Sequence, residues 1–231
     1  MEEHIQSTSH HLDFRFALKD LPQEHGFVPL RVEGQIPPAL SGTLFRNGPG
    51  VFSVAGTDVH HWFDGPGVVS AVRFVNGRAE GACRVVVSPD LQRERQAGKP
   101  LYGGMGAAGV GLRRFRVAPR NVANTNLLSW DGRLFALFEA GVPVEVCPED
   151  LSTIGETDLD GVVPMWFSAH HHRVAARQTT YNFGLRIGMR AHLDLFALPD
   201  RGKARLMGSV PLNGIPFLHD FIATQTHQLS H

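Results

Sequence analysis

The sequence is poor in cysteine, which argues against a disulfide framework. Only Cys83 and Cys147 occur among 231 residues, too few to hold a small secreted scaffold together. The first residues, MEEHIQSTSHHLDFRF, also lack the basic and then apolar profile of a secretory signal. We therefore expect a cytoplasmic protein with reduced thiols.

Net charge and long apolar runs are missing as well. Lys and Arg number 22, and so do Asp and Glu, so no net field draws the chain to nucleic acid or to an anionic membrane. No apolar run approaches the ~20 residues that span a bilayer, since Ser70 and Arg73 interrupt even GVVSAVRFV. We expect no nucleic-acid partner and, at most, a peripheral contact with a membrane.

Two common catalytic motifs are absent too. The stretch GGMGAAGVG is rich in glycine, but no strand–loop–helix unit surrounds it and no Walker lysine follows it. The chain also has no G-x-S-x-G element around a nucleophilic serine. Dinucleotide binding and serine hydrolysis are therefore poor hypotheses.

Glycine and proline, by contrast, are spread along the chain and predict an all-β protein. The 25 Gly and 15 Pro break it into short segments in which apolar and polar residues alternate, a pattern typical of strands. Asn76-Gly77 and Asp131-Gly132 each predict a tight hairpin turn. Further strands are expected in GTLFRNG, VHHWFDG, TTYNFG, HLDLFAL and ARLMGSVPL. This regular spacing favours a sandwich, a barrel or a propeller.

One short helix is predicted in SPDLQRERQAG. Ser88 is a suitable N-cap and Gly98 a suitable C-terminal residue, whereas Glu94 is expected on a solvated face. The following LYGGMGAAGVGL is expected to be a glycine-rich loop, and residues 1–25 a loose N-terminal segment. No linker marks a boundary, so we treat 1–231 as a single domain.

Histidine is the conspicuous residue type, with 13 in the chain and a run at His170, His171 and His172. Neutral imidazole is the commonest nitrogen ligand of Fe, Zn, Cu and Ni. Neighbouring residues of a strand point to opposite faces, so only His170 and His172 could share a site. Taken alone, each is more often a structural or exposed histidine than a ligand. Glu139 fits either the orienter of a metal-bound histidine or a salt bridge at a strand end.

Several stretches, in order along the chain, resemble one family, the carotenoid cleavage oxygenases. It includes carotenoid, apocarotenoid and stilbene dioxygenases and the retinal pigment epithelium isomerase. The stretches are GQIPPALSGTLFRNGPG, HHWFDGPGVVSAVRF, RERQAGKPLYGG, VANTNLLSWDGRLFALFEAGVPVEVCPEDLSTIG, FSAHHHR and FLHDF. The resemblance covers most of the chain.

The resemblance implies a seven-bladed β-propeller with Fe(II) on its axis, held by four histidines with glutamates behind them. His170 and His219 match the first two ligands, and Glu139 matches the first of the glutamates. The family uses O₂ to cleave a double bond of an apolar conjugated substrate into two carbonyl products. Phe167 and Phe217 would suit the walls of the substrate tunnel, although core packing explains them equally well.

Family members are about twice as long as this chain, and the third and fourth histidines lie in the half that it does not contain. We therefore expect about half of a propeller, with one short helix and glycine-rich loops, that is inactive alone.

Two alternatives stay open. One is a degenerate half-propeller that binds an apolar ligand or a partner, or dimerises to complete its ring. The other is an enzyme of another class with Zn at His170 and His219. Iron content and metal identity distinguish these alternatives, whereas the substrate and the oligomeric state are left open by the sequence.

Overall fold

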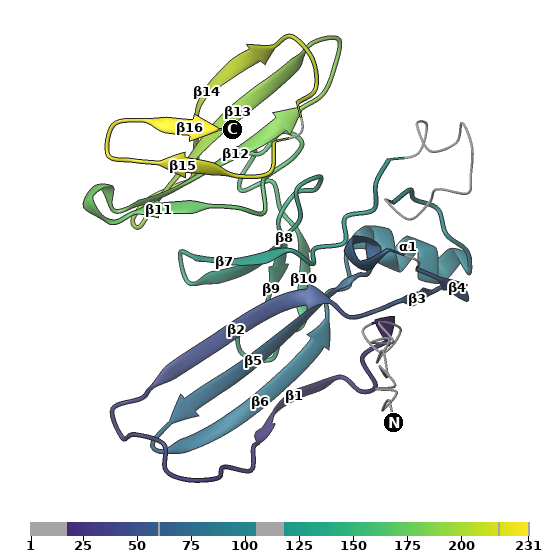
Figure 1. The fold of residues 1–231 in the computed structure, drawn as a ribbon, viewed down its shortest axis with the longest axis vertical. Coiled ribbons are helices and arrows are strands. Elements are labelled where there is room, and N and C mark those ends of the chain that lie inside the picture. The colour runs from purple at the N-terminus through teal and green to yellow at the C-terminus, as the bar shows by residue number, and fades with distance from the viewer. Residues whose placement is uncertain (1–17, 60, 105–117, 217, 231) are drawn as a thin grey trace, which may run out of the picture.

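The structure is a computed structural model that describes residues 18–59, 61–104, 118–216 and 218–230. The chain forms three four-stranded antiparallel sheets, which we call the first, second and third blades. They follow one another along the chain (Figure 1). The prediction of an all-β protein with a short helix is confirmed in these residues. They contain no helix that is long and apolar enough to cross a membrane.

The first blade has the strand order β1-β6-β5-β2. Its strands are β1 (His25–Pro29), β2 (Gly42–Pro49), β5 (Gly67–Val75) and β6 (Arg78–Val85). Between β5 and β6, Asn76 and Gly77 have φ values of 51° and 72°. Both residues are thus in the left-handed region that a two-residue hairpin turn requires, which confirms the predicted turn.

The second blade has the order β10-β9-β8-β7. Its strands are β7 (Asn126–Trp130), β8 (Arg133–Leu137), β9 (Val144–Val146) and β10 (Thr153–Glu156). Asp131 and Gly132 repeat the same turn, with φ values of 52° and 72°. This second predicted hairpin is also confirmed.

The third blade has the order β11-β12-β13-β14 and is followed by a separate hairpin, β15-β16. The strands are β11 (His172–Val174), β12 (Thr179–Arg186), β13 (Ala191–Pro199), β14 (Arg205–Leu212), β15 (Phe221–Ala223) and β16 (Gln228–Ser230). A short 3-10 turn, η4 (Ala175–Arg177), connects β11 to β12. The described residues thus hold three blades, with one hairpin after the third blade.

The predicted helix is α1 (Pro89–Ala97). The Ser88 hydroxyl accepts a hydrogen bond from the Leu91 N–H at 3.4 Å, and Gly98 ends the helix at a φ of 62°. Both predicted caps are therefore confirmed.

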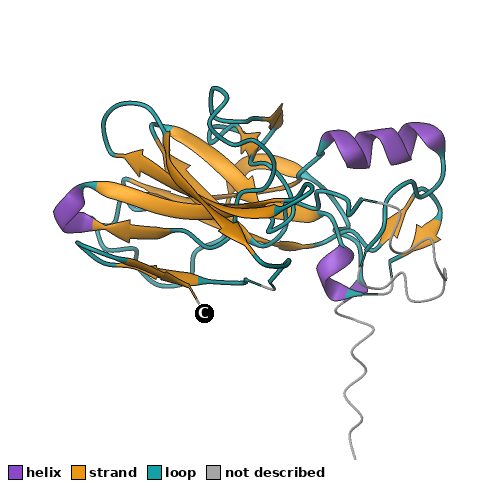
Figure 2. Ribbon diagram, turned by 90° about the horizontal axis from the view of Figure 1, so that it is seen from above, coloured by secondary structure: helices purple, strands orange, loops and turns teal. Residues whose placement is uncertain are grey.

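Figure 2 shows α1 and the small hairpin of β3 (Ser53–Val54) and β4 (Thr57–Asp58) beside the blades rather than between them.

Two local expectations are wrong. The stretch VHHWFDG is not a strand, because Trp62–Asp64 form a 3-10 turn, η2, capped by the His61 ring. Trp62 and Phe63 are 42% and 59% exposed, so the alternation around them does not line a core. Glu94 is not solvated but 0% exposed, and it is paired with Arg120.

Apolar side chains fill the spaces between successive blades. One cluster joins the first two blades around Val69, Ala71, Leu134 and Val144. Another joins the second and third blades around Phe135, Leu137, Phe167, Phe196 and Leu198. Each blade therefore buries one face against the next, which fixes the ends of neighbouring blades relative to one another.

The predicted loose segment 1–25 is described only from residue 18 onward. There, the Asp20 carboxylate accepts hydrogen bonds from the backbone N–H groups of Phe52 and Ser53. Glu24 accepts one from the Val85 N–H at 3.1 Å. This part of the segment therefore contacts the first blade through Glu24 and residues 52–53 through Asp20, while most of the predicted glycine-rich loop lies outside the described residues.

Candidate metal centre

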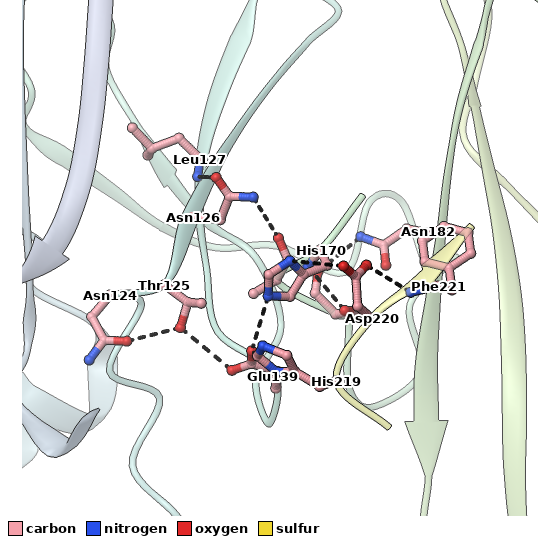
Figure 3. A network of polar contacts seen from close by, with 12 residues as sticks. Asn124, Thr125, Asn126, Leu127, Glu139, His170, Asn182, His219, Asp220 and Phe221 are labelled. Carbon is pink, nitrogen blue, oxygen red and sulfur yellow. Dashed lines mark hydrogen bonds and ion pairs between the residues drawn. The ribbon is translucent and has the colours of Figure 1, made fainter. Parts of the chain in front are cut away.

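Three side chains from different parts of the chain meet at one point. Glu139, His170 and His219 each offer one ligand atom, and these atoms lie within 4.8 Å of one another. The Glu139 Oε1 atom is 3.2 Å from the His219 Nδ1 atom and 3.7 Å from the His170 Nε2 atom. Figure 3 shows the three side chains facing one another. The sequence separates them, and the fold brings together the three residues predicted for the metal site.

Both histidines occupy the same place in successive units of the fold. His170 lies two residues before β11, the first strand of the third blade, and His219 lies two residues before β15, the first strand of the next unit. Radial repetition brings equivalent positions to the axis of the arrangement. The two imidazole rings meet edge to face, with centroids 4.5 Å apart.

The second blade supplies the carboxylate. Glu139 follows the end of β8 at Leu137. Its side chain is 29% exposed, compared with 30% for His170 and 60% for His219. The cluster is therefore partly enclosed, and a small ligand has access to it from the side of His219.

One nitrogen of the His170 ring is buried without a hydrogen-bond partner among the described residues. This is the Nε2 atom, and the Glu139 oxygen at 3.7 Å is too distant to be its partner. Leaving such a group unsatisfied costs about 1–3 kcal/mol. A divalent metal ion would satisfy this nitrogen, and an imidazole-rich donor set suits Fe, Zn, Cu or Ni. These residues thus fit a metal ion.

Neighbouring carboxylates approach the two rings without hydrogen-bonding to His170. The Asp220 Oδ2 atom is 3.9 Å from the His170 Nδ1 atom, and its other oxygen accepts a hydrogen bond from the Phe221 N–H at 2.7 Å. The Thr125 hydroxyl is 3.5 Å from the second Glu139 oxygen. Asp220 beside the cluster and Glu139 within it therefore place negative charge close to the rings, as a cation site needs.

The other two histidines of the run lie outside the cluster. The His172 Nδ1 atom accepts a hydrogen bond from the Ala223 N–H at 3.1 Å and so ties β11 to β15. Burial lowers the pKa of His171, and His170 and His172 lower it further. Only His170 of the three offers a ligand atom to the cluster.

The two predicted tunnel aromatics differ in what the structure describes. Phe167 is 0% exposed and packs against Phe196, with ring centroids 5.5 Å apart, in the core between the second and third blades. Its surroundings match core packing, the alternative to a tunnel wall that the sequence left open. Phe217 lies outside the described residues.

Sequence reasoning missed the asparagines around the His170 segment. The Asn126 carboxamide donates to the Ala169 carbonyl at 3.0 Å, and the Asn182 carboxamide donates to the Ser168 carbonyl at 2.9 Å. Asparagine is disfavoured in strands, yet Asn126 lies in β7 and Asn182 in β12. That mismatch is the signal that could have singled them out.

Comparisons with known proteins identify a family and several relatives of the chain. The chain matches the profile of the family described as "RPE65: Retinal pigment epithelial membrane protein" over residues 18–229. It is 34% identical over 216 residues to the apocarotenoid-15,15'-oxygenase of Synechocystis sp., a match that covers 88% of this chain and 44% of the relative. It is 34% identical over 225 residues to the resveratrol cleavage oxygenase 1 of Aspergillus fumigatus, with 92% and 45% covered.

A solved structure gives the same picture of the fold. The cobalt-substituted apocarotenoid oxygenase of Synechocystis superposes with a TM-score of 0.76 at 32% identity, over 88% of this chain and 45% of that one. The predicted partial propeller is thereby confirmed. The chain spans less than half the length of the curated relatives it matches. Because the family profile matches nearly all of its described residues, the chain belongs to the RPE65 family, the carotenoid cleavage oxygenases.

Proposed function

We propose that this chain is the N-terminal part of a non-haem iron(II) dioxygenase that cleaves a carbon–carbon double bond of an apolar conjugated substrate. The observation that carries the proposal is the convergence of His170 and His219 on Glu139, with the His170 Nε2 atom buried and without a partner among the described residues. The names of the relatives, an apocarotenoid oxygenase and a resveratrol cleavage oxygenase, support this substrate class.

In this proposal His170 and His219 hold the metal, and Glu139 orients a ring. The 3.2 Å approach of Glu139 to His219 Nδ1 fixes that ring and leaves its other nitrogen for the metal. A carboxylate in this place also raises the basicity of the imidazole. Iron(II), when bound, would supply the open coordination positions at which O₂ is activated.

The substrate class follows from the same family. We propose an apocarotenoid, carotenoid or stilbene-like substrate, with O₂ as the second substrate and two carbonyl products. A cytoplasmic location with a peripheral membrane contact belongs to the same proposal. We expect these 231 residues alone to turn over no substrate, because they supply two of the four histidines that the family resemblance implies.

A chimera tests the activity. Residues 18–229, which match the family profile, would replace the corresponding part of the Synechocystis apocarotenoid-15,15'-oxygenase. We expect the chimera, loaded with Fe(II), to consume O₂ and cleave an apocarotenoid, with products followed by chromatography. His170→Ala and His219→Ala should each abolish cleavage, because each removes a metal ligand.

His192→Ala is the matched control for the chimera. His192 lies on β13 and is outside the cluster, so its loss should leave cleavage unchanged. A folded chimera that is equally active with and without His170 would refute the proposal. Zinc rather than iron in the purified protein would favour the zinc enzyme that the sequence left open.

A further inference from the structure

We propose that Asn126 and Asn182 are positioning residues that aim His170 at the metal by holding its backbone from two sides. The inference rests on the proposed function, since it assigns His170 as a ligand. It goes further by naming what orients that ligand in the absence of a hydrogen bond to its ring.

The His170 ring makes no hydrogen bond among the described residues. Its Nε2 atom is unpartnered, and its Nδ1 atom lies 3.9 Å from Asp220, beyond hydrogen-bond distance. A metal-binding histidine is usually held by a hydrogen bond to its second nitrogen. His219 has a carboxylate in that place, with the Glu139 Oε1 atom 3.2 Å from its Nδ1 atom. The orientation of His170 must therefore come from its backbone and its packing.

Asn126 holds that backbone from the second blade. Its Nδ2 group donates to the Ala169 carbonyl at 3.0 Å, the peptide oxygen directly before His170. Its Oδ1 atom accepts the Leu127 N–H at 2.8 Å. This second bond fixes the amide so that its donor faces the His170 segment, as Figure 3 shows.

Asn182 repeats the arrangement from the third blade. Its Nδ2 group donates to the Ser168 carbonyl at 2.9 Å, and its Oδ1 atom accepts the Phe183 N–H at 2.6 Å. Asn182 is 0% exposed, so bulk solvent does not compete for these bonds. Two successive peptide oxygens are thus fixed by two locked amides that approach from different blades.

Bonds within the segment complete the support. The Ser168 N–H donates to the Phe183 carbonyl at 2.8 Å, and the His170 N–H donates to the Ser168 hydroxyl at 3.0 Å. Apart from the bond between His170 and Ser168, the backbone bonds of residues 168–170 therefore connect to Asn126, to Asn182 or to the strand that carries Asn182. Loss of either amide frees the backbone that carries the ligand.

Asn121 offers a matched control. It is 4% exposed, and its Nδ2 group donates to the Val142 carbonyl at 2.9 Å and to Glu156 at 2.8 Å. Its replacement by alanine removes as many hydrogen bonds as the other two replacements do. Its hydrogen bonds in the described part of the chain go to Ser88, Asp90, Val142 and Glu156 and not to residues 168–170, so it reports a loss of stability without a loss of positioning.

The experiment is a Co(II) titration of the 231-residue chain, followed by ligand-field absorption. Asn126→Ala and Asn182→Ala should each weaken Co(II) binding by about 10–100-fold, the usual effect of losing a group that orients a ligand. Asn121→Ala should stay within about twofold, as expected for a site that does not couple to the metal. Equal affinities in all four proteins, or an equal loss in Asn121→Ala, would overturn the inference.

Asn126→Asp keeps the protein testable if the alanine variants do not fold. It preserves the volume and the acceptor for Leu127 but loses the donor to Ala169. Its added negative charge attracts the cation, so a merely structural amide predicts tighter Co(II) binding. We expect weaker binding, and tighter binding would contradict the positioning role.

A metal-free measurement separates failure of the inference from failure of the proposed function. If the wild-type chain binds no Co(II), the metal-holding role that the proposed function gives to His170 and His219 fails in the isolated chain, and the positioning is read from nitrogen-15 spectra of the histidine rings. The His170 signals, assigned by their loss in His170→Ala, should shift in Asn126→Ala and Asn182→Ala and stay in place in Asn121→Ala. Unchanged signals in all three variants would overturn the inference.

Discussion

Replacement of Glu94 by alanine is expected to lower the free energy of unfolding by about 3–5 kcal/mol, the usual effect of breaking a buried ion pair. Glu94 is 0% exposed, and one of its oxygens lies 2.6 Å from the Arg120 Nη1 atom. The other oxygen accepts the backbone N–H groups of Leu101 and Tyr102 at 2.9 and 3.2 Å. The replacement would leave the Arg120 guanidinium, itself 9% exposed, as an unpaired buried charge.

The loss of stability should affect several elements together, because the ion pair of Glu94 and Arg120 joins them. Glu94 belongs to α1, and Arg120 also donates to the Asp64 carbonyl at the end of η2. Urea unfolding followed by circular dichroism measures the change. Glu33→Ala is the control, since Glu33 and Arg31 form an ion pair with side chains 79% and 87% exposed, and it should cost less than about 1 kcal/mol. Similar values for the two variants would refute the buried pair.

Replacement of Gly184 by alanine is expected to destabilise the protein, through the third blade, at least as much as replacement of Glu94 does. A Cβ atom there would lie 1.8 Å from the Trp166 carbonyl oxygen and 2.8 Å from its carbon. Both are backbone atoms, and β12 is held between β11 and β13, so neither side has room to yield. We expect a loss of at least about 3 kcal/mol in unfolding free energy, the upper end of the usual cost of overpacking.

Gly208→Ala is the control for this steric argument. Gly208 lies on β14, and a Cβ atom there meets no described residue within 4 Å. Its replacement should change the unfolding free energy by no more than about 0.5 kcal/mol. Equal stabilities of the two variants in urea would contradict the close approach of β12 to the Trp166 carbonyl.

Features set by neighbouring residues were predictable from the sequence. The turns at Asn76 and Asp131 depend on a left-handed conformation of two adjacent residues. The helix ends at Ser88 and Gly98 likewise depend on residues that touch the helix itself. Such signals need no tertiary contact, so the pattern alone was sufficient.

Features set by distant partners were not predictable. Glu94 has the local context of an exposed helix residue, and the arginine that neutralises it is 26 positions away. Asn126 binds a carbonyl 43 positions away. The histidine run alone did not show which ring reaches the site. His170 was singled out by resemblance to a family, and its contact with His219 exists only after successive units of the fold are in place.

The central claim is that His170 and His219 together hold a metal ion. The most direct test is equilibrium titration of the 231-residue chain with Co(II), an ion one step from Fe(II) in the affinity order of divalent metals. The wild-type chain and His192→Ala should each bind one Co(II) with the same affinity and the same absorption bands. Loss of a group that orients a ligand weakens metal binding by about 10–100-fold. His170→Ala and His219→Ala should each weaken Co(II) binding by more than that. No saturable binding by the wild-type chain, or equal affinity in all four proteins, would contradict the claim.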